Sequence, residues 1–244
     1  MKYKHLEEHH NLVAPNQIVP ILVDLFNPKS VLDVGCGLGT FLKSFKDHGV
    51  KKVLGIDGNW VDKGLLFKNI DSEEFLEEDL EKEIFFDSKF DLVLSLEVAE
   101  HLSQDAADDF VRSLTNAGDL IIFSAAIPFQ GGYNHLNEQW IGYWEKKFKV
   151  YGYKKYDFFK EMLWDNPNVF WWYKQNMVVF SRSEMKINLR ENNLTNLVHY
   201  DLFLGKSVQC KSFEDGLRGY LSPWFYLKLF LKSVLWRLGI YKIV

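Results

Sequence analysis

The chain is poor in cysteine, has no excess of positive charge and contains no long uninterrupted apolar run. Its only two cysteines among 244 residues, Cys36 and Cys210, can form neither a disulfide framework nor a cysteine-based zinc site. The net charge of −4 argues against a nucleic-acid partner, because sequence-independent binding needs a basic patch. No apolar stretch reaches the ~18 residues of a membrane-spanning helix, and residues 1–8 lack the apolar core of a secretory signal. We therefore expect a protein of the reducing cytoplasm.

Apolar periodicity predicts that strands and helices alternate over most of the chain. Apolar residues at spacings of three and four predict three helices. These helices cover residues 16–26, 40–48 and 103–114, the last with Ser103 as N-cap. Buried strands are predicted at residues 30–34, 52–57, 90–95, 119–124 and 176–181. Because the strands alternate with helices, the pattern indicates an α/β fold with a doubly wound, mostly parallel sheet.

The pattern changes near residue 186. We predict a catalytic-type α/β domain over residues 1–186 and a C-terminal extension over residues 187–244. Residues 187–214 are polar and irregular, whereas Ser222 and Pro223 form an N-cap and a favoured first helical position.

The predicted C-terminal helix spans residues 223–238. One face carries Trp224, Leu227, Leu231, Val234, Leu235 and Leu238, and the other side carries Lys228, Lys232 and Arg237. Such an amphipathic helix can lie on a membrane surface, here the inner membrane face. The alternative is that it packs on its own domain or on a second subunit. The sequence leaves the oligomeric state open.

A glycine-rich turn follows the first predicted strand and opens a helix. It reads Asp33-Val34-Gly35-Cys36-Gly37-Leu38-Gly39-Thr40, and ligands of doubly wound folds bind at such a turn. Thr40 stands where a dinucleotide fingerprint has its third glycine, which disfavours an oxidoreductase. An acidic residue before the first glycine suits a cationic ligand with an amino group. Asp57, at the end of the second predicted strand, can accept hydrogen bonds from both hydroxyls of a ribose.

These motifs resemble those of class I S-adenosylmethionine-dependent methyltransferases, and the resemblance covers residues 15–183. Residues 31–39 correspond to the first motif of that family. The resemblance implies a Rossmann-like sheet of seven strands, with the last strand antiparallel and inserted beside the sixth. It also implies S-adenosyl-L-methionine as the cofactor.

The same resemblance implies a cofactor site made of nine residues. They are Asp33, Gly35, Gly37, Gly39, Asp57, Gly58, Asp79, Leu80 and Glu97. Asp33 would hold the ammonium group at the methionine end, Asp57 would bind the ribose, and Asp79 would meet the adenine amino group. Asp79 also lies in an acidic run, for which a solvated charged surface is the alternative.

Two histidines are candidate general bases. Methyl transfer to oxygen or nitrogen requires the acceptor to be held close to the methyl group and often requires removal of its proton. His101 and His135 follow the strands predicted at residues 90–95 and 119–124, whose carboxyl ends open on one side of the sheet. A structural role in the loop is the alternative for His101.

A divalent metal is a further alternative. If residues 97–101 are helical, Glu97, Glu100 and His101 share one face, and with His135 they would make a mixed oxygen and nitrogen ligand set. This cluster is similar to that of metal-assisted methyltransferases of small-RNA 3′ ends and of ubiquinone biosynthesis. Metal-free relatives also carry the Glu-His-Leu segment, so the metal stays an open alternative.

Aromatic and amide side chains suggest a sugar acceptor. Asn137, Gln139, Trp140 and Trp171 suit a sugar, whose apolar faces stack on rings and whose hydroxyls bind amides. Residues 124–132, the segment around His135 and the Trp171-Trp172-Tyr173 run resemble bacterial methyltransferases of surface-polysaccharide biosynthesis. That resemblance implies an O-methyltransferase acting on a sugar or nucleotide-linked sugar. The alternatives are an RNA ribose or small-molecule O-methyltransferase, and a cofactor-binding module without catalysis.

Overall fold

The computed structural model describes residues 11–185 and 197–238, and the chain forms two compact units. The first unit runs from Met1 to His199 and the second from Tyr200 to Val244. The boundary predicted at residue 186 falls at the start of a segment outside the described residues.

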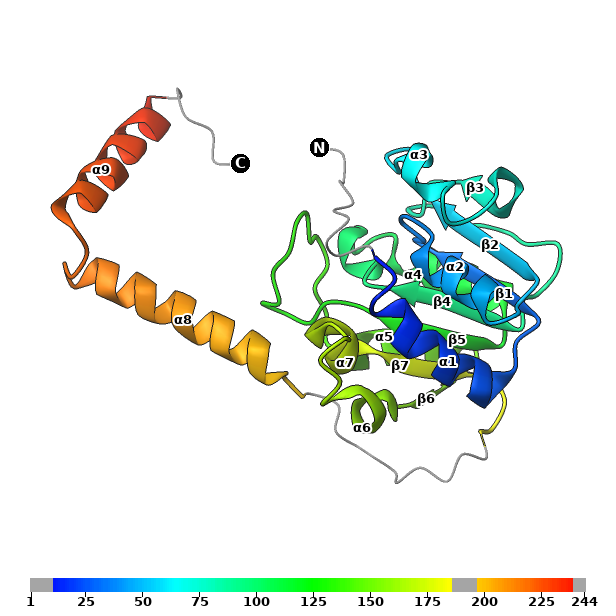
Figure 1. Ribbon diagram of the computed structural model, residues 1–244. Helices are drawn as coiled ribbons and strands as arrows, with labels where there is room; N and C mark the ends of the chain where they lie inside the picture. Colours follow the sequence, from blue (N-terminus) through cyan, green and yellow to red (C-terminus); the bar gives the residue numbers. More distant parts are fainter. Residues whose placement is uncertain (1–10, 186–196, 239–244) are drawn as a thin grey trace. The chain divides into compact units, whose positions relative to one another are not determined.

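The first unit is built on a seven-stranded mixed sheet in the order β3-β2-β1-β4-β5-β7-β6 (Figure 1). The strands are β1 (Ser30–Val34), β2 (Lys52–Asp57), β3 (Phe75–Glu77), β4 (Leu92–Leu96), β5 (Leu120–Ser124), β6 (Lys154–Tyr156) and β7 (Val178–Ser181). The first five strands pair in parallel, and β7 runs antiparallel between β5 and β6. The predicted α/β fold with an inserted antiparallel last strand is confirmed.

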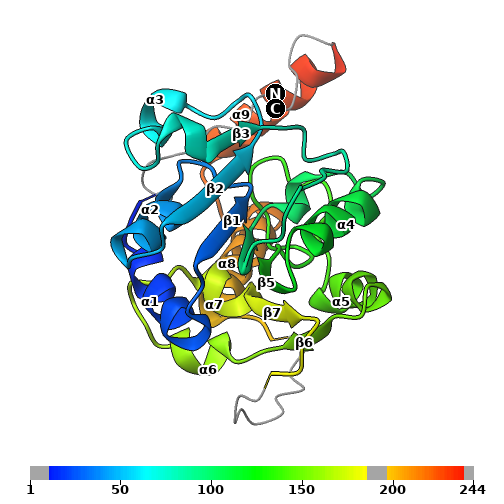
Figure 2. The same cartoon turned by 90° about the vertical axis from the view of Figure 1, so that its right-hand side faces the viewer.

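Helices cover both faces of this sheet. They are α1 (Pro15–Phe26), α2 (Thr40–Asp47), α3 (Lys63–Leu66), α4 (Ala107–Ala117), α5 (Ile141–Val150), α6 (Phe159–Leu163) and α7 (Trp171–Asn176), with short 3₁₀ turns η1 (Ser72–Glu74) and η2 (Ala99–His101). Figure 2 shows α1 and α2 on one side of the sheet, with α4 and α5 on the other. The fold is therefore doubly wound, as predicted.

One predicted helix begins later than expected. The predicted N-cap, Ser103, lies four residues before the first residue of α4, Ala107. Its hydroxyl accepts a hydrogen bond from the Ala106 amide at 3.2 Å and donates to Glu81, so it caps the turn that leads into α4. The apolar periodicity extends through this turn, and for that reason it predicted a longer helix.

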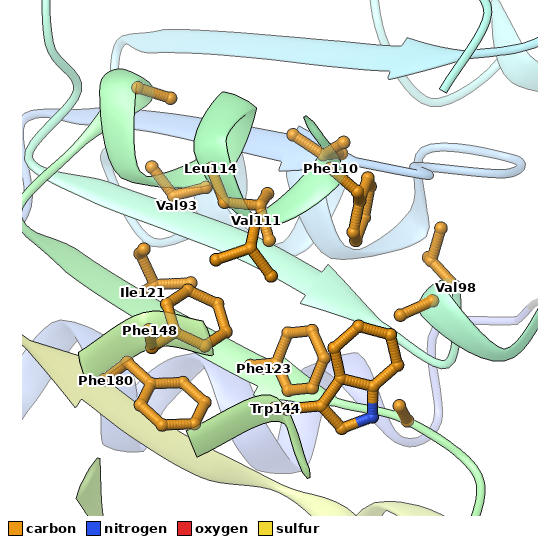
Figure 3. Packing of buried hydrophobic residues seen from close by; sticks show 14 of the residues in the cluster. Val93, Val98, Phe110, Val111, Leu114, Ile121, Phe123, Trp144, Phe148 and Phe180 are labelled. Atoms are coloured by element: carbon orange, nitrogen blue, oxygen red, sulfur yellow. The ribbon is translucent and has the colours of Figure 1, made fainter. Parts of the chain in front are cut away.

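The central strands β1, β4 and β5 are buried on both faces, and their side chains alternate between two cores. In β4, Leu92 and Leu94 join the core under α1 and α2, whereas Val93 faces the core under α4 and α5. Figure 3 shows the second core, where Phe123, Trp144 and Phe148 gather with Phe180. The rings of Phe148 and Phe180 stack with centroids 4.0 Å apart. These aromatic residues fix α5 and β7 against β5.

The register of the parallel strands brings their carboxyl ends to one edge. Leu32 of β1 pairs with Val93 of β4, which pairs with Ile121 of β5. The turns that follow Val34, Leu96 and Ser124 therefore leave the sheet side by side. This edge carries the candidate site.

Over residues 200–238, the part of the second unit that the structure describes, there are two helices, α8 (Tyr200–Leu217) and α9 (Pro223–Arg237). The prediction of an irregular segment was wrong for residues 200–214, which belong to α8. Their apolar residues are spread around the helix and do not form one face, so the pattern gave no amphipathic helix signal. Helix α9 was predicted correctly, and the Ser222 hydroxyl accepts from the Phe225 amide at 3.3 Å. Among residues 11–185 and 197–238, no helix combines the length and apolar character needed to cross a membrane.

Candidate active site

The glycine-rich turn between β1 and α2 is bound to the end of β2. The amides of Gly35 and Cys36 both donate to the Ile56 carbonyl, at 2.7 and 3.1 Å. Gly35, Gly37 and Gly39 all have positive φ, and a Cβ on Gly35 would lie 2.3 Å from Val98. A side chain at Gly35 is therefore excluded both by backbone conformation and by space.

Two buried carboxyl groups, Asp33 and Asp57, face this turn. The Asp57 carboxylate accepts hydrogen bonds from the amides of Gly37 at 2.8 Å and Gly58 at 2.7 Å. Burial raises the pKa of Asp57 to about 6, although these hydrogen bonds oppose the shift. Burial and the nearby Asp57 raise the pKa of Asp33 to about 8. A pair of buried acids gains a favourable partner when a positively charged ligand binds.

A pocket beside Asp33 gives such a ligand access. Gly35, Thr40, Phe41 and Tyr173 contribute to its lining, together with Leu96 at the end of β4. An acid, exposed backbone and aromatic side chains together fit a ligand that has an ammonium group, a sulfonium and a nucleoside. The residues present therefore fit S-adenosylmethionine.

The structure places the predicted adenosine residues around the end of β2. The indole of Trp60 covers Gly58, and a Cβ there would lie 2.2 Å from the ring. Asp79 is exposed, with its carboxylate 3.1 Å from Lys82. The side chain of Leu80 is buried in the core, so its backbone alone is left for a ligand. Trp60 was not predicted, because a single aromatic residue in a loop carries no periodic signal.

Glu97 is held by a network of amides from distant segments. Its backbone is left-handed, with φ of 56°, and its amide donates to the Ser124 hydroxyl at 3.0 Å. Its carboxylate accepts from Gln130 at 3.0 Å and from Asn176 at 3.1 Å. Burial raises the pKa of Glu97, and the amide hydrogen bonds oppose that shift. Gln130 and Asn176 lie 33 and 79 residues away, so no local spacing could have indicated them.

Glu100, His101 and His135 come together at the same edge of the sheet. One possible ligand atom from each lies within 4.8 Å of the others. Glu100 is only 1 % exposed, and its two carboxylate oxygens have no hydrogen-bond partner among the described residues. Burial and Glu97 raise the pKa of Glu100 well above its usual range. A buried carboxyl group without a partner fits either a bound proton or a bound cation.

The four-residue ligand set that the sequence left as an alternative is formed only in part. Residues 97–101 are not a continuous helix, because the 3₁₀ turn covers only Ala99–His101 and Glu97 is left-handed. The condition under which Glu97, Glu100 and His101 would share one helical face is therefore not met. The Glu97 carboxylate instead contacts the amides, while Glu100 and the two histidines form the cluster.

The two histidines have different surroundings. The Nδ1 of His135 lies 2.8 Å from the Glu138 carboxylate, which also accepts from the amides of Phe129 and Gly131. A carboxylate accepts only, so it orients the ring with the proton on Nδ1 and with Nε2 as proton acceptor. The Nδ1 of His101 lies 3.3 Å from the Asn134 carbonyl. Burial, with the nearby His135, lowers the pKa of His101 to about 4, which makes it a weak base.

The predicted substrate residues divide between the interior and the surface. Asn137 is buried, and its side-chain oxygen accepts from Gln139 at 3.0 Å. Trp140 is exposed at the start of α5, and Trp171 is partly exposed at the start of α7. The segment around His135 also exposes the side chains of Phe129, Tyr133 and Leu136. These three apolar residues lie in an irregular loop and were not predicted.

Comparisons with known proteins agree with this geometry. Residues 8–199 match the family model described as a methyltransferase domain. A comparison with proteins of curated function gave no match. The solved structures of similar fold include the methyltransferase domain of bacterial CtHen1, at 20 % identity and a TM-score of 0.50, covering 70 % of this chain and 100 % of that one.

Two further structures share the fold. DesVI from Streptomyces venezuelae has 12 % identity and a TM-score of 0.53, over 74 % of this chain and 100 % of that one. A putative O-methyltransferase from Nostoc punctiforme has 16 % identity and a TM-score of 0.50, over 70 % of this chain but only 56 % of that one. At these identities the likeness concerns the fold. The family model spans most of the chain, and the protein therefore belongs to the methyltransferase-domain family and is an S-adenosylmethionine-dependent methyltransferase.

Proposed function

We propose that the enzyme methylates a hydroxyl of a sugar or nucleotide-linked sugar, in the biosynthesis of a surface glycan, with His135 as the proton acceptor. The observation that carries this proposal is the 2.8 Å contact between His135 and Glu138 at the edge that holds the glycine-rich turn. The cofactor supplies a methyl group on a positively charged sulfur.

The chain's own residues would bind the cofactor and accept the proton of the acceptor hydroxyl. Asp33, Asp57 and the glycine-rich turn would bind and orient the cofactor. A hydroxyl keeps its proton at neutral pH, so a nearby base assists its attack. His135 would accept that proton on Nε2, and Glu138 would stabilise the resulting positive charge on the ring. This role suits His135 better than His101, whose lowered pKa makes it a poor acceptor.

The surface beside His135 supports a sugar acceptor. Exposed rings of Phe129, Tyr133 and Trp140 surround the loop, and aromatic faces stack on the apolar faces of sugars. A structural neighbour described as a putative O-methyltransferase supports oxygen as the acceptor atom. The glycan assignment itself depends on the sequence resemblance.

A second candidate is metal-assisted O-methylation, and the unpartnered Glu100 carboxylate favours it. Glu100, His101 and His135 offer the oxygen and nitrogen ligands that Mg²⁺, Mn²⁺ or Zn²⁺ accept. A divalent ion held there would stabilise the deprotonated hydroxyl. His135 would then be a ligand. An RNA ribose acceptor is less compatible with the net charge of −4.

The experiment measures methyl transfer to a panel of nucleotide sugars, with and without chelator. For the base mechanism, His135→Gln and Glu138→Gln lower kcat by about 10²-fold or more, while chelator and Glu100→Gln have little effect. The control is His48→Gln, which removes an exposed histidine from the C-terminal end of α2 and leaves activity unchanged.

The other outcomes distinguish the alternatives. The metal mechanism is established if chelator removes the activity, if Mn²⁺ or Mg²⁺ restores it, and if Glu100→Gln abolishes it. Cofactor binding without turnover of any sugar or RNA acceptor contradicts the proposed reaction. It favours a cofactor-binding module.

A further inference from the structure

Helix α9 exposes apolar side chains around most of its circumference. Trp224 is 63 % exposed, Phe230 64 % and Trp236 56 %, and none of the residues of α9 is buried. The apolar residues are not confined to the predicted face, because Phe225, Leu229 and Trp236 lie on the opposite side of a helical projection. A helix that is apolar on nearly all sides belongs in an apolar environment.

The charge of this segment is of one sign. Residues 217–244 contain no acidic residue, and the basic residues include Arg218, Lys228, Lys232 and Arg237. In α8 the charges are mixed, since Lys206 and Lys211 are accompanied by acidic residues of the same helix. Positive charge and exposed apolar surface therefore occur together in α9, although the whole chain has a net charge of −4.

The lysines divide the apolar surface of α9 into two strips. Lys228 and Lys232 lie four residues apart on one line of the helix, between a strip that contains Trp224 and Leu231 and a strip that contains Leu229. The Lys228 ammonium lies 5.7 Å from the Trp224 ring centroid. A lysine can bury its methylenes beside apolar neighbours while its ammonium reaches the polar phase. This arrangement suits a helix immersed at the level of lipid headgroups.

The length of α9 indicates how it would lie. Its 15 residues extend about 22 Å at ~1.5 Å per residue, less than the ~30 Å hydrocarbon core of a bilayer. The helix is too short to span a bilayer and would therefore lie along the surface.

The start of α9 is fixed by local hydrogen bonds. The Tyr226 hydroxyl donates to the Gly216 carbonyl at 2.7 Å, and the Leu221 amide donates to the same hydroxyl at 3.2 Å. Together with the Ser222 cap, these bonds define the turn between α8 and α9 within the second unit. A preformed turn lowers the entropy cost of docking.

We infer that α9 docks on the surface of a bilayer that contains anionic lipids. Its apolar side chains enter the boundary between headgroups and acyl chains, and its basic residues bind the lipid phosphates. A second copy of α9 is a poorer partner, because two helices with only positive charges repel each other. The inference does not depend on the identity of the methyl acceptor.

The experiment measures binding of the full chain to vesicles of phosphatidylcholine alone and of phosphatidylcholine with phosphatidylglycerol at 3:1. We expect binding to the anionic vesicles that weakens at high salt, with little binding to the neutral ones. Lys228→Glu with Lys232→Glu lowers the partition coefficient by about tenfold or more. Trp224→Ser with Leu231→Ser lowers it similarly by removing apolar contacts.

The matched control is Lys206→Glu with Lys211→Glu, which makes the same charge change in α8 and alters binding by less than about twofold. Affinity for S-adenosylhomocysteine, measured on every variant, verifies that the first unit is intact. Equal binding to neutral and anionic vesicles overturns the inference, as do equal losses in the α8 and α9 variants. The chain could instead bind no vesicles and form a dimer that dissociates in the variant Trp224→Ser with Leu231→Ser. That result overturns the inference and assigns α9 to contact with a second copy.

Discussion

At the scale of single residues, we predict that Asp33 couples cofactor binding to pH. Its pKa of about 8 keeps the carboxyl group protonated in the free protein below that pH. A bound ammonium stabilises the carboxylate, so binding releases the proton. Affinity for S-adenosylhomocysteine therefore rises between pH 6 and 8, by up to about tenfold per pH unit. Calorimetric titration in buffers of different ionisation enthalpy measures the proton released.

The control for this prediction is Asp33→Asn, which keeps the shape but has no proton to release. This variant binds S-adenosylhomocysteine more weakly at pH 8, and its affinity depends less on pH. The pH dependence that remains arises from Asp57, whose pKa is about 6. The same pH slope in Asp33→Asn and in the parent would show that Asp33 does not meet the ammonium group.

Alanine substitutions at Gly35 and Gly152 distinguish the cost of backbone strain from the cost of a steric conflict. Both have similar positive φ, 84° and 82°, but a Cβ on Gly35 meets Val98 at 2.3 Å and one on Gly152 meets nothing within 4 Å. Gly152→Ala should cost only the left-handed conformation, about 1–2 kcal/mol of unfolding free energy. Gly35→Ala should cost clearly more and should abolish cofactor binding. Urea unfolding and calorimetry measure the two effects.

A second substitution tests the cause. In the double variant Gly35→Ala with Val98→Ala, the smaller side chain at position 98 relieves the steric conflict. The double variant should therefore lose less unfolding free energy than the sum of the losses in the two single variants. If the two substitutions are simply additive, contact with Val98 is not the reason that position 35 requires glycine.

At the scale of secondary-structure elements, the aromatic residues of α5 and α9 have opposite roles. Trp144 of α5 is fully buried and its ring centroid lies 5.4 Å from that of Phe123, whereas Trp236 of α9 is more than half exposed. Trp144→Ala should lower the unfolding free energy by about 3–5 kcal/mol. Trp236→Ala should change it by less than about 0.5 kcal/mol. Equal costs in urea unfolding would mean that α9 is packed within the folded protein.

The same scale shows how far the sequence predicts the structure. The five longer strands and α1, α2, α4 and α9 follow from apolar runs, helical spacing and capping residues. The strands β3 and β6 have three residues each, too few for a periodic signal, and their pairing depends on neighbours distant in sequence. Helix α8 was missed because its apolar residues are spread around the helix and form no single apolar face.

The residues of the candidate site likewise include some that the sequence indicates and others that only the fold reveals. Asp33, Asp57 and the glycines lie within one or two local motifs, so the sequence indicates them directly. The hydrogen bonds of Glu97 depend on Gln130 and Asn176, which tertiary folding alone brings near it. The contact between His135 and Glu138 spans three residues, but it needs the loop conformation that Glu138 itself helps to fix.

At the scale of the whole molecule, the boundary between the two units can be tested by truncation. His199 is buried in the first unit, where its amide donates to the Gln175 side chain at 2.7 Å and its ring lies 4.6 Å from that of Trp164. Gln175 in turn donates to Asn176, which binds Glu97. The contacts of His199 are therefore connected to the candidate active site.

A chain ending at residue 199 should keep the stability and the S-adenosylhomocysteine affinity of the parent within about twofold, while losing vesicle binding. A chain ending at residue 186, where composition changes, lacks His199, so Gln175 loses that hydrogen-bond partner. We expect its free energy of unfolding to fall by about 1–3 kcal/mol. Thermal unfolding and calorimetry of both truncations measure the difference. If the two are equally stable, the domain ends near residue 186, as the composition predicted, and the contacts of His199 contribute nothing to the fold.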